Sequence, residues 1–127
     1  MSQVPLFSKT WDEGRVWDLW MIVHFLSGVS GGLSNVFLKL STQNLWLLAI
    51  ALMIVWEIIE YANGIREQIE NRVIDLFVGL AGVYAATSFA STAATPTEQI
   101  AFVVSTILVA AACFLGWRAY KKRAAEA

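Results

Sequence analysis

Ionisable side chains inside the apolar stretches of this sequence are the residues whose types could do chemistry. They are His24, Glu57, Glu60 and Asp75. An ionisable group inside a membrane-spanning helix is energetically costly, so its presence there suggests a function by default. Counting along the expected helices at about 1.5 Å per residue puts all four in one layer, on one side of the membrane. We therefore predict that they converge.

Glu57 and Glu60 are three residues apart and share a helix face, which Asn63 extends. Two neighbouring carboxylates repel each other and require a cation, a proton or a hydrogen-bond donor. Oxygen ligands suit Mg²⁺ or Mn²⁺, and a histidine also permits Zn²⁺ or iron. The predicted polar pocket comprises His24, Glu57, Glu60, Asn63, Arg66, Arg72 and Asp75. Its possible metal ligands are Glu57, Glu60, Asp75 and His24.

Each residue of this predicted pocket also has a purely structural interpretation. The two glutamates could extend to the membrane surface and pair with an arginine. Asp75 could be an acid favoured by the dipole in the first turn of its helix. His24 could hydrogen-bond a neighbouring helix. The sequence leaves these alternatives open.

The elements that position these residues follow from the apolar composition. The chain has 127 residues, of which 57% are hydrophobic and 15% charged. A soluble domain of this size cannot bury so much apolar surface, whereas a bilayer can accommodate it. Stretches of about 20 apolar residues can cross a membrane. We predict a single all-α domain over 1–127, an integral membrane four-helix bundle with spans 17–38, 45–61, 73–90 and 97–117.

Capping signals add detail at the helix ends. Thr10 precedes Glu13 by three residues, which is the spacing of a capping box, so a short interfacial helix is expected near Trp11. Ser41 and Thr42 can cap the second span. Pro96 suits the first turn of the fourth helix.

The positions of the nine Lys and Arg residues predict orientation. With four spans, all except Lys39 lie on the side of the two termini, and the positive-inside rule places that side in the cytoplasm of a bacterial inner membrane. The net charge of −1 offers no basic surface for nucleic acid. Membrane lipids are the expected partners, with a homo-oligomer or a membrane complex as further possibilities. The single cysteine, Cys113, is expected to serve packing.

Glycines at short spacing in the first and third spans predict close helix packing. These residues are Gly28, Gly32, Gly79 and Gly82. Small residues at such positions allow two helix backbones to approach each other in a membrane, either within one chain or between copies of it in an oligomer.

The run WEIIEYANGIREQIENRVIDLFVGLAG, residues 56–82, resembles the core signature of VanZ-like and YjdF-like membrane proteins. Glu57, Arg66, Asp75 and Gly82 match the glutamate, arginine, aspartate and last glycine of that pattern. Glu60 stands in place of a glutamine and Gly79 in place of an asparagine, and the stretch between the arginine and the aspartate is longer. The resemblance implies a polytopic bacterial protein of the cell envelope, in a family whose activity is poorly defined.

Three functions of different classes remain open from the sequence. The first is handling of an envelope lipid headgroup in the polar pocket, with or without catalysis and a divalent metal. The second is a non-enzymatic subunit or scaffold of a larger or homo-oligomeric complex. The third is a small ion-linked or proton-linked transporter, although the outer half of the spans lacks polar groups. A second resemblance, of Glu60, Asn63 and Glu67 to a motif of prokaryotic diacylglycerol kinase, differs in the length of the following loop.

Overall fold

The computed structural model describes residues 5–12, 14–65 and 67–126. In this part of the chain every regular element is a helix: α1 (Trp20–Leu33), α2 (Asn35–Leu38), α3 (Thr42–Ala62), α4 (Ile69–Ala90) and α5 (Thr95–Glu126). Four helices are long and apolar enough to cross a membrane, since α2 continues α1 as one stretch, Trp20–Leu38. The prediction of an all-α protein with four candidate spans is confirmed.

The helix bounds differ from the predicted spans because hydropathy marks the apolar part of a helix and not its ends. Helix α4 begins at Ile69, and α5 continues to Glu126 through an Ala-, Lys- and Arg-rich tail. At the beginning of α4 and at the end of α5, the apolar stretch ends at Glu, Lys or Arg residues. These residues and alanine are nevertheless good helix formers, so the helices extend beyond their apolar stretches. At the start of α3 the Ser41 hydroxyl accepts a hydrogen bond from the Asn44 amide, as the capping signal predicts.

The interfacial helix expected near Trp11 is not formed by residues 5–12 and 14–18, so that prediction is wrong for this part of the chain. Glu13, its expected capping partner, lies outside the described residues. The Thr10 hydroxyl instead donates to the Asp12 carboxylate at 2.6 Å, a local bond that competes with helix formation. The segment folds back on itself through an isolated bridge between Phe7 and Trp17.

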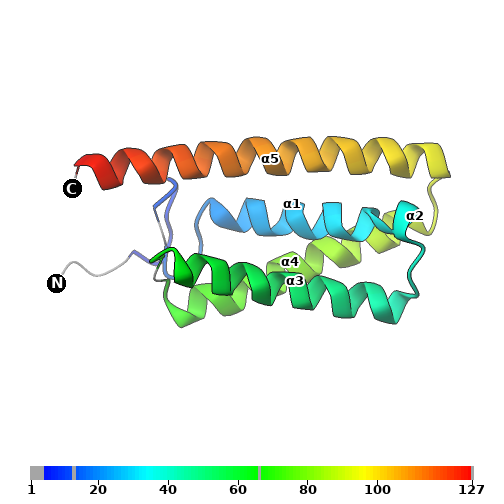
Figure 1. Ribbon diagram of the computed structural model, residues 1–127, viewed down its shortest axis with the longest axis horizontal. Helices are drawn as coiled ribbons and strands as arrows, with labels where there is room; N and C mark the ends of the chain where they lie inside the picture. Colours follow the sequence, from blue (N-terminus) through cyan, green and yellow to red (C-terminus); the bar gives the residue numbers. More distant parts are fainter. Residues whose placement is uncertain (1–4, 13, 66, 127) are drawn as a thin grey trace.

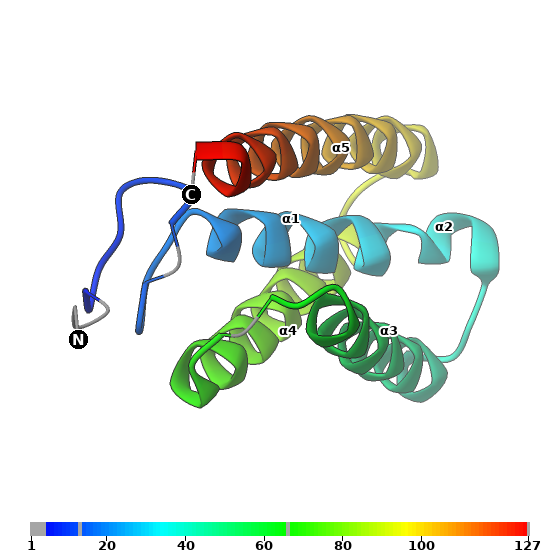
Figure 2. The same cartoon turned by 60° about the vertical axis from the view of Figure 1, so that its left-hand side comes forward.

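Helix α1 lies between α5 on one side and α3 with α4 on the other (Figure 1). The second view shows the same order, with α4 crossing beneath α1 (Figure 2). The described N-terminal segment, the end of α5 and the connection from α3 to α4 all lie at one end of the bundle, which we call the terminal end (Figure 1). Half of α1 is buried, whereas only Leu45, Ala49 and Glu60 are buried in α3. Helix α3 is therefore the most loosely packed of the three shorter spans.

Glycines allow α1 and α4 to pack with their backbones in contact. A Cβ added at Gly28 would lie 1.9 Å from the carbonyl oxygen of Gly79, and one added at Gly82 would lie 2.2 Å from that of Phe25. At Gly32 it would lie 2.6 Å from the Cβ of Ala86. These distances are far below van der Waals contact, so only glycine fits at this interface. The close approach brings the polar side chains of α1 and α4 within reach of each other.

Candidate functional site: a buried polar network beside an apolar cavity

A network of buried polar side chains connects α1, α4 and the segment before α1. The Asn71 amide of α4 donates to Asp75 Oδ2 at 3.1 Å and to Asp18 Oδ2 at 3.3 Å. Asp75 Oδ2 also lies 3.5 Å from His24 Nε2 of α1. Asp18, Asn71 and Asp75 are each 0% exposed, and His24 is 9% exposed. The network runs from the terminal end into the interface between α1 and α4.

Asp18 holds the beginning of α1 in place. Its Oδ1 accepts a hydrogen bond from the Trp20 amide at 2.9 Å, and its Oδ2 accepts one from the Gly14 amide at 3.1 Å. Burial raises the pKa of the Asp18 carboxyl above its ordinary value, although these hydrogen bonds act in the opposite direction. The Asp18 carboxyl therefore stabilises the beginning of α1 through its hydrogen bonds, although its removal from water costs desolvation free energy.

Several atoms of the network have unused hydrogen-bonding capacity. Asp75 Oδ1 and Asn71 Oδ1 are buried and have no hydrogen-bond partner in the described part of the chain. A buried acceptor without a donor costs about 1–3 kcal/mol. Native structures rarely leave such groups unsatisfied, so each one calls for a ligand, an ion or a water.

A polar cavity of about 200 Å³ adjoins this network between α1, α3 and α4. Its ionisable lining residues are His24, Glu57, Arg72 and Asp75. Arg72 Nε lies 3.6 Å from Glu57 Oε2, and the guanidinium carbon lies 5.9 Å from the centre of the Tyr61 ring. Of the residues predicted for the pocket, these four thus line one cavity.

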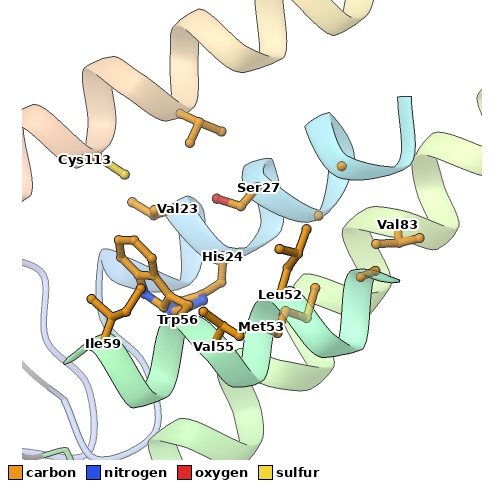
Figure 3. A pocket seen from close by; sticks show the side chains of 14 residues that line it. Val23, His24, Ser27, Leu52, Met53, Val55, Trp56, Ile59, Val83 and Cys113 are labelled. Carbon is orange, nitrogen blue, oxygen red and sulfur yellow. The ribbon is translucent and has the colours of Figure 1, made fainter. Parts of the chain in front are cut away.

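A larger cavity of about 380 Å³ lies against the other side of His24 and is almost entirely apolar. Cys113 of α5 and Trp56 of α3 line this cavity from different sides (Figure 3). Ser27 lies one helical turn beyond His24 on α1 and also lines it. His24 and Met53 line both cavities. Among the described residues, these two are the side chains that the apolar and the polar cavity share.

Glu60 belongs to a different group from His24 and Asp75. One carboxylate oxygen from each of Glu57, Glu60 and Glu67 lies within 4.8 Å of the others, an arrangement that could hold a metal ion. The possible ligand set predicted from the sequence is thus divided, with Glu57 and Glu60 in this cluster and His24 beside Asp75. A divalent metal stays a prediction, because the clustering of acids alone does not require one.

Asn63 and Arg66 are the two remaining residues of the predicted pocket. Asn63 is exposed, and its side-chain amide donates to the carbonyl oxygen of Ile59 at 2.7 Å. It therefore serves the C-terminal end of α3, where the last carbonyls lack helical partners, and lines neither cavity. Arg66 lies outside the described residues.

Sequence reasoning missed Asp18 and Asn71 as members of the site. Asp18 is the second residue of the predicted span 17–38, although α1 itself begins at Trp20. Asn71 is four residues before Asp75 and so on the same helix face. Both positions were usable signals, Asp18 as an acid inside a predicted span and Asn71 through its spacing from Asp75.

Comparison with protein-family models, with curated proteins and with solved structures found no match for this chain. The functional argument therefore depends on the geometry of the two cavities.

Proposed function

We propose that this protein binds a lipid or a lipid-like amphiphile within the membrane and handles its headgroup in the polar cavity. The observation that carries the proposal is the sharing of His24 and Met53 by an apolar and a polar cavity. A ligand that occupies both spaces must have an apolar part and a polar part. This combination defines an amphiphile.

The apolar cavity suits a hydrocarbon chain. Its walls come from α1, α3, α4 and α5, and its lining includes Val23, Leu52, Val83 and Val109. Ligand sites in proteins are usually apolar spaces with a few placed polar groups, and here these are His24 and Ser27. A chain bound there would have a protonatable side chain at one end.

The polar cavity supplies the groups that a headgroup requires. Arg72 carries a fixed positive charge, and a guanidinium pairs well with phosphate. Asp75 and Glu57 supply acceptors, and His24 can accept or donate a proton. If chemistry follows binding, His24 beside Asp75 is the candidate general base, because the carboxylate can orient the ring.

The VanZ-like resemblance is part of the proposal. Glu57 and Asp75, two of its four matching positions, line the same cavity, and Gly82 packs against α1. Two positions of the pattern at one cavity are compatible with a binding motif. We accordingly propose a bacterial inner-membrane protein of this type whose terminal end faces the cytoplasm.

Orientation can be tested separately with introduced cysteines in a Cys113→Ala background. Ala124→Cys, at an exposed position near the end of α5, should resist an impermeant thiol reagent added to intact cells and react after lysis. Ser41→Cys, at the start of α3, should react in intact cells. The reverse pattern would overturn the proposed orientation.

Native mass spectrometry of the protein released from its own membrane tests the lipid proposal. Gly31 lines the apolar cavity, and a Cβ added there would have nothing within 4 Å, so Gly31→Leu should fill the cavity without disturbing the fold. We expect wild type to carry lipid and Gly31→Leu to carry at least about tenfold less. A tenfold difference corresponds to the apolar contact of about one or two buried side chains. Ala51→Leu places the same leucine side chain at an exposed position of α3 and should retain the lipid.

The single native cysteine gives a second measurement. Cys113 lines the apolar cavity, so a membrane-soluble maleimide should label it more slowly in lipid-loaded protein than in delipidated protein. Equal lipid retention by wild type and Gly31→Leu, together with an unchanged labelling rate, would overturn the proposal and favour a scaffold.

A further inference from the structure

We propose that the headgroup taken by the polar cavity carries a primary ammonium group beside a phosphate. This inference rests on the proposed lipid site and specifies the chemistry of its ligand. It follows from the unused acceptors of α4, from the charge around them and from the residues that line the cavity.

The first argument is the buried acceptor that the cavity contains. Asp75 lines the polar cavity, is 0% exposed, and its Oδ1 has no hydrogen-bond partner in the described part of the chain. Asn71 Oδ1, one turn earlier on the same helix, is also buried without a hydrogen-bond partner in the described part of the chain, but Asn71 does not line the cavity. Asp75 Oδ1 requires a donor, and a primary ammonium carries three N–H donors and no acceptor.

The second argument is the sign of the local charge. Asp18 and Glu57 lie close enough to Asp75 to act on it electrostatically. Arg72 is the cation paired with Glu57, whereas neither Asp18 nor Asp75 has a Lys or Arg partner in the described part of the chain. A ligand that brings a positive charge to Asp75 therefore gains attraction in a medium of low dielectric constant.

The third argument separates a primary ammonium from a quaternary one. Quaternary ammonium groups have no N–H donor and are usually held by aromatic faces. Neither Trp, Tyr nor Phe lines the polar cavity among the described residues. The cavity thus lacks the walls that a choline headgroup uses and has the acceptors that an ethanolamine headgroup uses.

Arg72 accounts for the phosphate. Its Nε has no hydrogen-bond partner in the described part of the chain, although Glu57 lies 3.6 Å away. A guanidinium with free donors beside a site for an ammonium group fits a zwitterionic phosphate–amine head. The ligand class is accordingly an aminophospholipid.

Competitive loading with three phospholipids of identical acyl chains tests this inference. Delipidated protein is mixed with equal amounts of phosphatidylethanolamine, phosphatidylcholine and phosphatidylglycerol, and bound lipid is read by native mass spectrometry. We expect wild type to retain phosphatidylethanolamine at least about tenfold over each of the others, the scale of one charge-assisted hydrogen bond. This comparison needs no variant.

Variants then assign the preference to the cavity. Asp75→Asn and Glu57→Gln should bind all three lipids about equally while total lipid stays near the wild-type amount. The matched control is Glu70→Gln, an exposed acid of α4 that pairs with Arg15 outside the cavity, and it should keep the preference. Loss of the preference in this control as well would overturn the assignment to the cavity.

Two further arms identify the source of the positive charge. Ethanolamine without acyl chains, at millimolar concentration, should not displace the lipid, and EDTA should not change the preference. Displacement by free ethanolamine, or loss of the preference with EDTA, would overturn the inference in favour of a soluble amine or a metal ion.

The failures of the two proposals are distinguishable. Equal retention of the three headgroups by wild type overturns the ammonium inference and leaves lipid binding intact. Retention of total lipid by Gly31→Leu, together with an unchanged labelling rate of Cys113, overturns lipid binding in the cavity itself.

Discussion

His24 Nε2 of α1 lies 3.5 Å from Asp75 Oδ2 of α4, at the polar end of the interface that Gly28 and Gly79 allow. The two residues are far apart in sequence, and their helices approach closely enough for this contact only because neither glycine has a side chain. The same close packing that stabilises the pair of helices thus assembles the polar site.

A double-mutant cycle between these residues should reveal their coupling. His24→Ala and Asp75→Ala each remove one partner of a buried contact, so the two losses of unfolding free energy should not add. We expect a coupling of about 0.5–3 kcal/mol, the range for residues in one polar network. Unfolding in detergent with increasing SDS gives the three differences, and additivity to within about 0.5 kcal/mol would mean that the pair is not coupled.

Alanine at two neighbouring glycines of α1 should have opposite effects. At Gly28 a Cβ would lie 1.9 Å from the Gly79 carbonyl oxygen, so Gly28→Ala must push the helices apart and should cost about 1–3 kcal/mol. At Gly31 a Cβ meets nothing within 4 Å, so Gly31→Ala should be neutral or should stabilise by up to about 1 kcal/mol through helix propensity. SDS unfolding of both variants checks this, and equal effects would contradict the packing of α1 on α4.

The Asp18 carboxyl should make stability depend on pH. Because burial raises its pKa in the folded state above the value of 3.8, the folded protein holds this proton more tightly than the unfolded chain. Its contribution to the free energy of unfolding is therefore complete below pH 3.8 and is lost as the pH rises through the raised pKa. Wild type should lose more stability than Asp18→Asn as the pH rises above 3.8, the direction that follows from this upward shift.

The absolute stability of Asp18→Asn supplies the control. Asparagine replaces one acceptor oxygen with a donor that faces the donors of Gly14 and Asn71. We expect a loss of about 1–3 kcal/mol at neutral pH. Identical pH profiles for the two proteins would show that another group is responsible for the dependence.

The end of α5 should hold the N-terminal segment against the bundle. Arg123 donates to the carbonyl oxygen of Trp11 at 2.9 Å and pairs with the Asp12 carboxylate, while Trp11 packs edge-on against Trp20. Arg123→Gln should speed hydrogen exchange of the Ser8 amide, which donates to Trp17 within this segment. The effect on overall stability should stay below about 1 kcal/mol, because the ion pair is exposed.

Lys121→Gln is the matched control for Arg123→Gln, because it removes one exposed positive charge from the same helical tail. It should leave hydrogen exchange of the N-terminal segment unchanged. If both variants speed exchange equally, general charge and not the specific contact holds the segment.

Much of the architecture could be predicted from the sequence because long apolar stretches admit few structures in a membrane. Backbone amides and carbonyls in hydrocarbon must be paired within the segment, so each stretch has to be a helix. The bounds were less certain, as at Ile69 and Glu126, because helix propensity continues where hydropathy stops. The expected helix near Trp11 failed because local side-chain bonds and contacts with α5 determine that segment.

The sequence by itself determined the residue types, the four apolar helices and the common depth of His24, Glu57 and Asp75, since period and length are properties of a single helix. Only the tertiary structure decided which of these residues meet. It joined His24 to Asp75, separated Glu60 into a cluster with Glu57 and Glu67, and brought Asp18 into the bundle. Rotation and crossing of helices depend on side-chain packing between segments distant in sequence, which no single helix encodes.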